Sequence, residues 1–480
     1  MGGRGPRADD DENLATMEKV ARMDLGEALR RCRTLEEGLE FFKVSVAAWP
    51  DDPRLNLGAG VNAQHLGLLD VAAGYYEVAA RIAADGPVKR QALVNRAAVD
   101  HERGAMELAI AGYRRVLDDF PEDTQALNNL GAALVTIGEH EQAMAVLDKC
   151  LKIDGDQPQA LTNLAMHHAN EGAVDEARDL LHRARRLLRA RAGGNDNRGT
   201  SDGAGLLARE VTMMRPMVED AGQMYAERLA FAGRVLALQH ALKDPVVRRR
   251  LRIEDPVTEV EHVHFYVPYS GLNDRRLQEA VSDCYRAMMN PQLDGPAGPS
   301  VSPRFSGFSD RKARVGFVSK FFGEHEPHGL LLEGLVTHLP RDLFTVVVCP
   351  VASPGRNAAS ELLVADADEL IPLGLNYAQT RLLLLAANLD VLVFADMLSE
   401  PMTYFLGFSR FAPVQIAFWG NPITTGRPSV DFFVSADRME HPERTRLAGD
   451  AEPYTEQVVL LDGQGIWYRR PTLPAGLPLP

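Results

Sequence analysis

The chain has 480 residues, of which 45% are hydrophobic and 25% charged, and its net charge at pH 7 is −14. This is the composition of an ordinary globular protein with about three domains, and its acidic balance argues against general nucleic-acid binding, which needs a concentrated basic surface. Apolar runs of about 18 residues are absent, so no membrane-spanning helix is expected, and the polar start is unlike a secretory signal; we expect a cytoplasmic or nuclear protein.

Residues 53–187 contain a sequence repeat with a period of 34 residues. The repeated small residues are Ala92, Ala126 and Ala160, Gly104, Gly138 and Gly172, and Ala143 and Ala177. A looser copy begins near Asn56. This period, with small residues at fixed places, is typical of tetratricopeptide repeats, which are pairs of helices. Four repeats would stack into a solenoid with a concave binding face, preceded in residues 1–52 by a tail and a capping helix.

Residues 188–300 are predicted to form a linker and a helical connector. The segment 192–204 is rich in Gly, Asn and Ser, which favours a loop. Long helical patterns return between about 205 and 253, and a second break rich in Gly, Pro and Ser covers 294–303.

Residues 301–470 alternate between apolar strands and helical stretches. We expect strands at 314–319, 344–349, 391–395 and 414–418, and helices at 328–337, 377–388 and 402–409. Fully apolar strands that alternate with helices indicate a parallel, doubly wound sheet, that is, one Rossmann-like lobe. A Pro-rich tail, 471–480, follows it.

Three polar loops follow predicted strands of this lobe, at 320–329, 396–400 and 419–426. Ligands of open α/β sheets bind beyond the carboxyl ends of the strands. The three loops are therefore expected to form the rim of one pocket.

The first loop contains His325 and His328, separated by Glu326 and Pro327. A metal site is disfavoured, because Pro327 interrupts any helix that would align two ligands and no third ligand cluster is visible. The four cysteines form no C-x-x-C pair, so a structural zinc site is not expected either. The residues themselves leave two interpretations of His325: a catalytic or substrate-contacting imidazole, or part of a polar turn before a helix.

The third loop, WGNPITTG, is more specific. Gly420 and Gly426 permit close approach of a ligand to the backbone, Thr424 and Thr425 offer hydroxyls, and Trp419 could stack on a ring. The alternative is a turn with a buried tryptophan.

An ordered series of segments, together with the repeats, resembles the protein O-linked N-acetylglucosamine transferase family, which includes SPINDLY-like relatives. The segments are 265–274, 314–325, 411–415, 419–426, 431–437 and 454–459. The resemblance covers about residues 55–470. It implies a tetratricopeptide solenoid followed by the first Rossmann-like lobe of a glycosyltransferase of type B.

The resemblance also implies a reaction, namely the metal-independent, inverting transfer of N-acetylglucosamine from UDP-N-acetylglucosamine to Ser or Thr of proteins that the repeats recruit. No cofactor is implied beyond this donor substrate. By motif, His325 takes the place of an active-site histidine, and His262 or His264 matches a second one. The donor- and acceptor-binding positions are Gly323, Trp419, Gly420, Pro422, Thr425 and Gly426.

Two departures from the family pattern support an alternative. Phe321 stands where the family usually has an Asp, and nothing after residue 470 matches the second lobe, which carries most of the nucleotide contacts. We therefore expect the second lobe to be absent, either because this is a partial gene product or because donor binding was lost. The alternative function is a non-catalytic tetratricopeptide scaffold with a relic lobe. Protein partners are expected on both interpretations, membrane or nucleic-acid partners on neither, and homodimerisation is left open.

Overall fold

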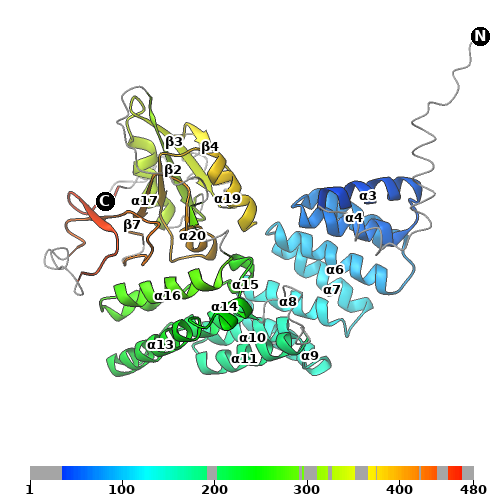
Figure 1. Cartoon of the computed structure of the whole chain (residues 1–480). Helices are drawn as coiled ribbons and strands as arrows, with labels where there is room; N and C mark the ends of the chain where they lie inside the picture. The colour runs from blue at the N-terminus through cyan, green and yellow to red at the C-terminus, as the bar shows by residue number, and fades with distance from the viewer. Residues whose placement is uncertain are drawn as a thin grey trace, which may run out of the picture. The chain divides into compact units, whose positions relative to one another are not determined.

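The computed structural model of the chain describes residues 35–191, 203–290, 295–296, 311–322, 327–351, 366–374, 376–420, 423–440 and 452–467 (Figure 1). The chain divides into two compact units, residues 1–167 and 168–480. The division lies inside the segment predicted as the fourth repeat. Among the described residues, no helix is both long enough and apolar enough to cross a membrane.

The first unit consists of antiparallel helices. They are α3 (Leu35–Ala48), α4 (Pro53–His65), α5 (Leu69–Ile82), α6 (Pro87–Glu102), α7 (Met106–Asp119), α8 (Thr124–Thr136), α9 (His140–Ile153) and most of α10 (Pro158–Asn170). From α3 to α9, each helix packs against the next. The pairs α4–α5, α6–α7 and α8–α9 are the first three predicted repeats, and α3 takes the predicted capping position.

The repeated small residues explain the pairing. Gly104 and Gly138 have φ angles of +76° and +80°, a conformation that glycine adopts without steric cost, and they make the turn between the two helices of their repeats. A Cβ on Gly131 would lie 2.6 Å from the side chain of Leu147, so the two helices can approach closely only because this residue is glycine. The helical tetratricopeptide prediction is confirmed.

The second unit begins with helices and continues into a sheet. The helices before the sheet are α11 (Val174–Arg191), α12 (Ala204–Thr212), α13 (Ala221–Ala241), α14 (Pro245–Arg250), α15 (Pro256–Val260), the 3-10 helix η1 (Val267–Ser270) and α16 (Arg275–Met288). Asp220, Asp244 and Asp255 cap α13, α14 and α15 by accepting hydrogen bonds from backbone N–H groups of the first turn.

The sheet has seven strands in the order β4-β3-β2-β5-β7-β8-β9, and every neighbouring pair is parallel. The strands are β2 (Ala313–Ser319), β3 (Phe344–Pro350), β4 (Glu369–Leu370), β5 (Val391–Phe394), β7 (Val414–Phe418), β8 (Phe432–Ala436) and β9 (Gln457–Leu461). Between them lie α17 (Pro327–His338), α19 (Tyr377–Ala386) and α20 (Pro401–Leu406), and a two-residue ladder pairs β1 (Gly295–Pro296) with β6 (Ser409–Arg410). The predicted parallel lobe is confirmed; β4, β8 and β9 were not predicted as strands.

The two faces of the sheet are covered differently. Phe317 and Val348 belong to a core that includes residues of α17. Val318 and Cys349, which point to the other face, belong to a larger core shared with α19, α20 and the helices α12, α13 and α16. The helical connector and the sheet therefore share one hydrophobic core in the second unit.

Candidate functional site

The three polar loops leave adjacent strands at the same edge of the sheet. β5 pairs with β2 on one side and with β7 on the other, all in parallel. The loops that follow Ser319, Phe394 and Phe418 therefore start side by side at the carboxyl edge. We call them the edge loops. Such an edge is where ligands of open α/β sheets bind.

Asp396 joins the first two edge loops. Its Oδ2 accepts hydrogen bonds from the Ser319 hydroxyl (3.1 Å) and from the backbone N–H of Lys320 (2.9 Å), and the Ser319 hydroxyl accepts one from the N–H of Phe321 (3.0 Å). Asp396 is fully buried, and no described residue bonds its Oδ1. Burial, with a contribution from the Glu400 carboxylate, raises the pKa of Asp396 to about 7. The edge thus holds a carboxyl group that titrates near neutral pH.

Glu400 completes the second edge loop as a cap of α20. Its carboxylate accepts hydrogen bonds from the N–H groups of Met402 (2.8 Å) and Thr403, and the Thr403 hydroxyl bonds the carbonyl of Asp396 (3.1 Å). These bonds tie the loop to the start of the helix, which fixes the backbone at Asp396.

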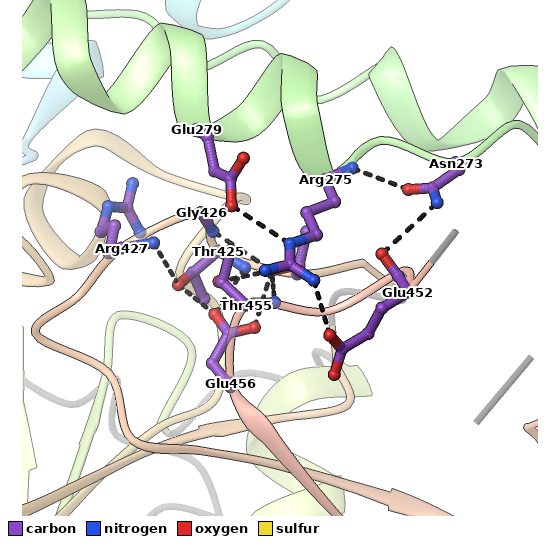
Figure 2. A network of polar contacts seen from close by, with 10 residues as sticks. Asn273, Arg275, Glu279, Thr425, Gly426, Arg427, Glu452, Thr455 and Glu456 are labelled. Atoms are coloured by element: carbon purple, nitrogen blue, oxygen red, sulfur yellow. Dashed lines mark hydrogen bonds and ion pairs between the residues drawn. The ribbon is translucent and has the colours of Figure 1, made fainter. Parts of the chain in front are cut away.

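The end of the third edge loop is held by a buried carboxylate, Glu456. It accepts hydrogen bonds from the hydroxyl of Thr424 (2.7 Å) and from the N–H of Thr425 (2.8 Å) and its hydroxyl. The Thr424 hydroxyl also bonds the Thr455 hydroxyl (2.8 Å). Figure 2 shows this cluster beneath α16. Both threonine hydroxyls are therefore engaged inside the protein.

Gly426 lies against the backbone of α16. Its φ angle is +67°, and a Cβ there would lie 2.5 Å from the carbonyl carbon of Gln278. The close backbone approach predicted for this glycine is made to the protein's own helix. Next to it, Arg275 of α16 pairs with Glu279 (3.1 Å) and Glu452 (2.7 Å), which links the helix to the segment that carries Glu456 (Figure 2).

Trp419 is half-buried at the end of β7. Its indole N–H donates to the carbonyl of Gly465 (3.4 Å), and its ring packs at a tilt against Phe418. Gly420 follows it and is also half-buried. Gly323, His325 and Pro422 lie outside the described residues, so the structure does not place these three predicted site residues.

Of the two histidines of the connector, His264 is buried and His262 half-buried. Desolvation depresses the pKa of each: that of His262 to about 3, with Arg209 contributing, and that of His264 to about 4. Both are neutral at pH 7. His264 Nε2 lies 2.8 Å from the Gln278 side-chain oxygen, and its ring meets the ring of Tyr404 edge-on at 5.5 Å. His264 therefore reaches α20, whereas no hydrogen bond or ring contact among the described residues joins His262 to the edge loops.

Arg427 is a residue that the sequence reading did not single out. It is buried, and its guanidinium lies 4.1 Å from the ring centre of Tyr404 and 4.4 Å from that of Phe408. No hydrogen bond to its three side-chain nitrogens is present among the described residues, and burial lowers the pKa of its guanidinium. The ring faces attract the cation and so anchor the third edge loop to α20. The sequence offered one indication of its importance, namely that Arg427 directly follows the last residue of the third edge loop, Gly426.

Within the described residues of the second unit, no three His, Cys, Asp or Glu side chains lie close enough to share a metal ion. What the carboxyl edge offers is hydrogen-bond and proton chemistry: a titratable buried carboxyl group, a hydroxyl and backbone amides held in a fixed arrangement.

The chain was compared with known proteins. A family model described as tetratricopeptide repeat matches residues 96–158, and no curated protein matches. Among solved structures, a mutant O-GlcNAc transferase of Thermobaculum terrenum is 20% identical with a TM-score of 0.52, over 80% of this chain and 59% of that chain. Another similar structure is MamA of Desulfovibrio magneticus RS-1, which is 18% identical over 37% of this chain and 96% of that chain, with a TM-score of 0.31. A third is pilF of Pseudomonas aeruginosa, which is 18% identical over 50% of this chain and 96% of that chain, with a TM-score of 0.33.

The first of these similarities establishes the fold. The second and third have TM-scores too low to carry an argument. This chain has tetratricopeptide helices followed by a glycosyltransferase-like lobe, as in the O-GlcNAc transferase, and it spans about 59% of that protein's length.

Proposed function

Starting from a fold shared with an O-GlcNAc transferase, we propose that this chain acts in protein O-glycosylation. In this proposal it transfers N-acetylglucosamine from UDP-N-acetylglucosamine to Ser or Thr of proteins recruited by its repeats, with inversion and without a metal ion. The observation that carries the proposal is the hydrogen bond between Ser319 and Asp396, which joins the first two edge loops at the carboxyl edge of such a fold.

Transfer to a hydroxyl needs a group that removes its proton and donors that stabilise the departing diphosphate. In the proposal His325 is the base or an acceptor-site contact. Asp396 is a positioning residue, because its bond to the N–H of Lys320 fixes the backbone that leads toward His325. Trp419 would lie against the donor sugar.

The repeats supply a surface suited to polypeptide acceptors. Asn95, Asn129 and Asn163 recur every 34 residues on α6, α8 and α10, the first helices of successive repeats. The Asn163 amide donates to Asn128 (2.9 Å), and Asn128 donates to Asn129 (3.2 Å). Side-chain amides both donate and accept, so a row of them can bond the backbone of an extended peptide whatever its side chains. This favours recruitment through the peptide backbone.

Two observations favour the second candidate, a non-catalytic scaffold. Phe321 stands where a carboxylate is expected, and the hydroxyls of Thr424 and Thr425 are bonded to Glu456. A scaffold would bind proteins through its repeats and would have no affinity for the donor.

Isothermal titration calorimetry of the 480-residue chain with UDP-N-acetylglucosamine separates the two candidates. The proposal predicts saturable binding, weakened about tenfold in Trp419→Ala, since one stacked ring contributes on the order of 1 kcal/mol. Trp467→Ala is the matched control, because that indole packs instead against Gly334 and His338 of α17, and its affinity should equal that of the wild type. If no saturable binding is observed, the non-catalytic scaffold is the function that remains.

A further inference from the structure

Charged side chains of helix α13 are engaged within the second unit. Glu227 pairs with Arg178 (2.8 Å), Arg228 donates to the Ser270 hydroxyl (2.9 Å), and Arg234 donates to a backbone carbonyl at Met213 (2.9 Å). A buried apolar stripe of the same helix packs into the core. Its members are Phe231, Val235 and Leu238. Polar and apolar contacts thus account for the inner side of the helix.

The opposite side of α13 is apolar as well, and it is exposed. We call it the outer stripe; it consists of Gly222, Tyr225, Ala226, Leu229, Ala230, Gly233, Leu236, Ala237 and His240. It contains no Asp, Glu, Lys or Arg. Leu229 is 75% exposed, Leu236 56% and Tyr225 52%, and a Cβ added at Gly233 would meet nothing within 4 Å.

A helix that is apolar on two opposite sides is normally buried on both. The outer stripe spans residues 222–240 of the 21-residue helix, which is about 28 Å at 1.5 Å per residue. Contiguous apolar surface of this kind marks an interaction site more often than isolated exposed leucines do. The spacing of Gly222, Ala226, Leu229, Gly233, Leu236 and His240 alternates between four and three residues, which is the pattern of a helix that packs along another helix.

We propose that the outer stripe binds the outer stripe of a second copy of this chain, with the two α13 helices antiparallel. A twofold axis at Phe231 places each large side chain opposite a small one. The opposed residues are Leu229 and Gly233, Leu236 and Ala226, and Tyr225 and Ala237. A self-complementary patch of this kind is what a twofold interface requires.

The charges at the two ends of the helix agree with the same arrangement. Glu219 and Asp220 are exposed before the helix, whereas Lys243 and the basic run Arg248–Arg250 are exposed after it. The axis that pairs Leu229 with Gly233 also brings Glu219 opposite Lys243 of the second copy. One acidic residue, Asp244, lies at the basic end, where its carboxylate caps α14. A parallel arrangement would instead place like charges together at each end.

A second copy of this chain fits the outer stripe in two respects: its large side chains meet small ones, and its acidic end meets the basic end. An unrelated protein would have to match both patterns independently. A strip about 28 Å long and roughly 10 Å wide buries on the order of 600 Å² over both copies, about half of what a stable specific interface buries, so the association is weak. We therefore expect a dimer that forms reversibly at micromolar concentration.

Sedimentation velocity of the 480-residue chain between about 1 and 100 μM tests the proposal. The wild type should pass from 52.7 kDa to twice that mass. Leu229→Glu should remain monomeric over the range. Leu108→Glu is the control, because Leu108 is 62% exposed in the first unit, and it should dimerise like the wild type. Circular dichroism of each variant confirms that the helices are retained.

A mixing experiment tests the register. Gly233→Lys alone should also be monomeric, because its side chain would meet Leu229 of the second copy. An equimolar mixture of Leu229→Glu and Gly233→Lys should dimerise, since the new Glu and Lys face each other across one half of the interface. A wild type that stays monomeric at 100 μM, a dimer that survives Leu229→Glu, or a mixture that fails to associate would each overturn the proposal.

Discussion

Replacing Asp396 by Asn should change how stability depends on pH. In the folded protein, burial and the Glu400 carboxylate raise the pKa of Asp396 to about 7, whereas in the unfolded chain it is about 3.9. Between these values the folded state holds a proton that the unfolded state has released. The free energy of unfolding of the wild type must therefore fall as the pH rises through this window. The Asn variant lacks this titration.

The size of the effect follows from linkage. One proton bound only in the folded state gives a slope of about −1.4 kcal/mol per pH unit. The full shift corresponds to at most about 4 kcal/mol between pH 4 and pH 7. The free energy of unfolding of the wild type minus that of the Asn variant should thus become more negative by this amount between pH 4 and pH 7. Above pH 7 the difference should level off.

Urea unfolding at pH 4, 5, 6, 7 and 8 measures the difference, and the common titrations of the two proteins cancel. A Trp49→Phe background leaves Trp419 and Trp467 as fluorescence probes, both in the second unit. Asp390→Asn is the control of opposite sign. Arg311, 2.6 Å from Asp390, holds the pKa of that carboxyl below its usual value. The stability of the wild type relative to this control should therefore rise slightly between pH 4 and about pH 5 and then stay constant to pH 8.

The reasoning about Asp396 is refuted by a stability difference that does not change with pH, or by one that favours the wild type increasingly toward pH 7. Either result would mean that the pKa of this carboxyl group is not raised in the folded state.

Three further predictions concern the third edge loop, the first loop and the repeats. Gly426→Ala should destabilise the second unit by roughly 3 kcal/mol or more in urea unfolding, because its Cβ would collide with the backbone of Gln278; Gly463→Ala, with φ +79° and open space, should cost about 1 kcal/mol, and equal losses would contradict the collision. His325→Ala should reduce transfer of a labelled sugar at least a hundredfold with an unchanged circular dichroism spectrum; unchanged turnover would refute its role. Asn128→Ala should weaken binding of an acceptor peptide a few-fold by fluorescence anisotropy, and unaltered binding would exclude this amide from the peptide site.

The sequence predicts those features of the fold that depend on local pattern. The 34-residue period identifies helix pairs because each repeat places glycine at its turn, as Gly104 and Gly138 do. The strands of the lobe are recognisable because they are apolar throughout, as expected where both faces of a sheet are covered. β4 has only two residues and is too short to show this pattern. β8 and β9 were also missed, although β9 is apolar in sequence; its side chains are largely exposed.

The site was harder to predict because its contacts join distant segments. Ser319 and Asp396 are 77 residues apart in sequence, and Thr425 and Glu456 are 31 apart. A threonine whose hydroxyl is free to meet a ligand and one whose hydroxyl is bonded to a buried glutamate look the same in a sequence. The outer stripe of α13 escaped notice for a similar reason, because which side of a helix faces solvent depends on its neighbours.

The central claim, that the chain acts in sugar transfer to proteins, is tested most directly by incubating it with UDP-[³H]N-acetylglucosamine and an unfolded acceptor protein rich in Ser and Thr. The account predicts label on the acceptor that increases with time, survives chelation of divalent metal ions and is lost in His325→Ala. The account would be contradicted if the wild type put no label on the acceptor at a saturating donor concentration. It would also be contradicted if His325→Ala labelled the acceptor as the wild type does.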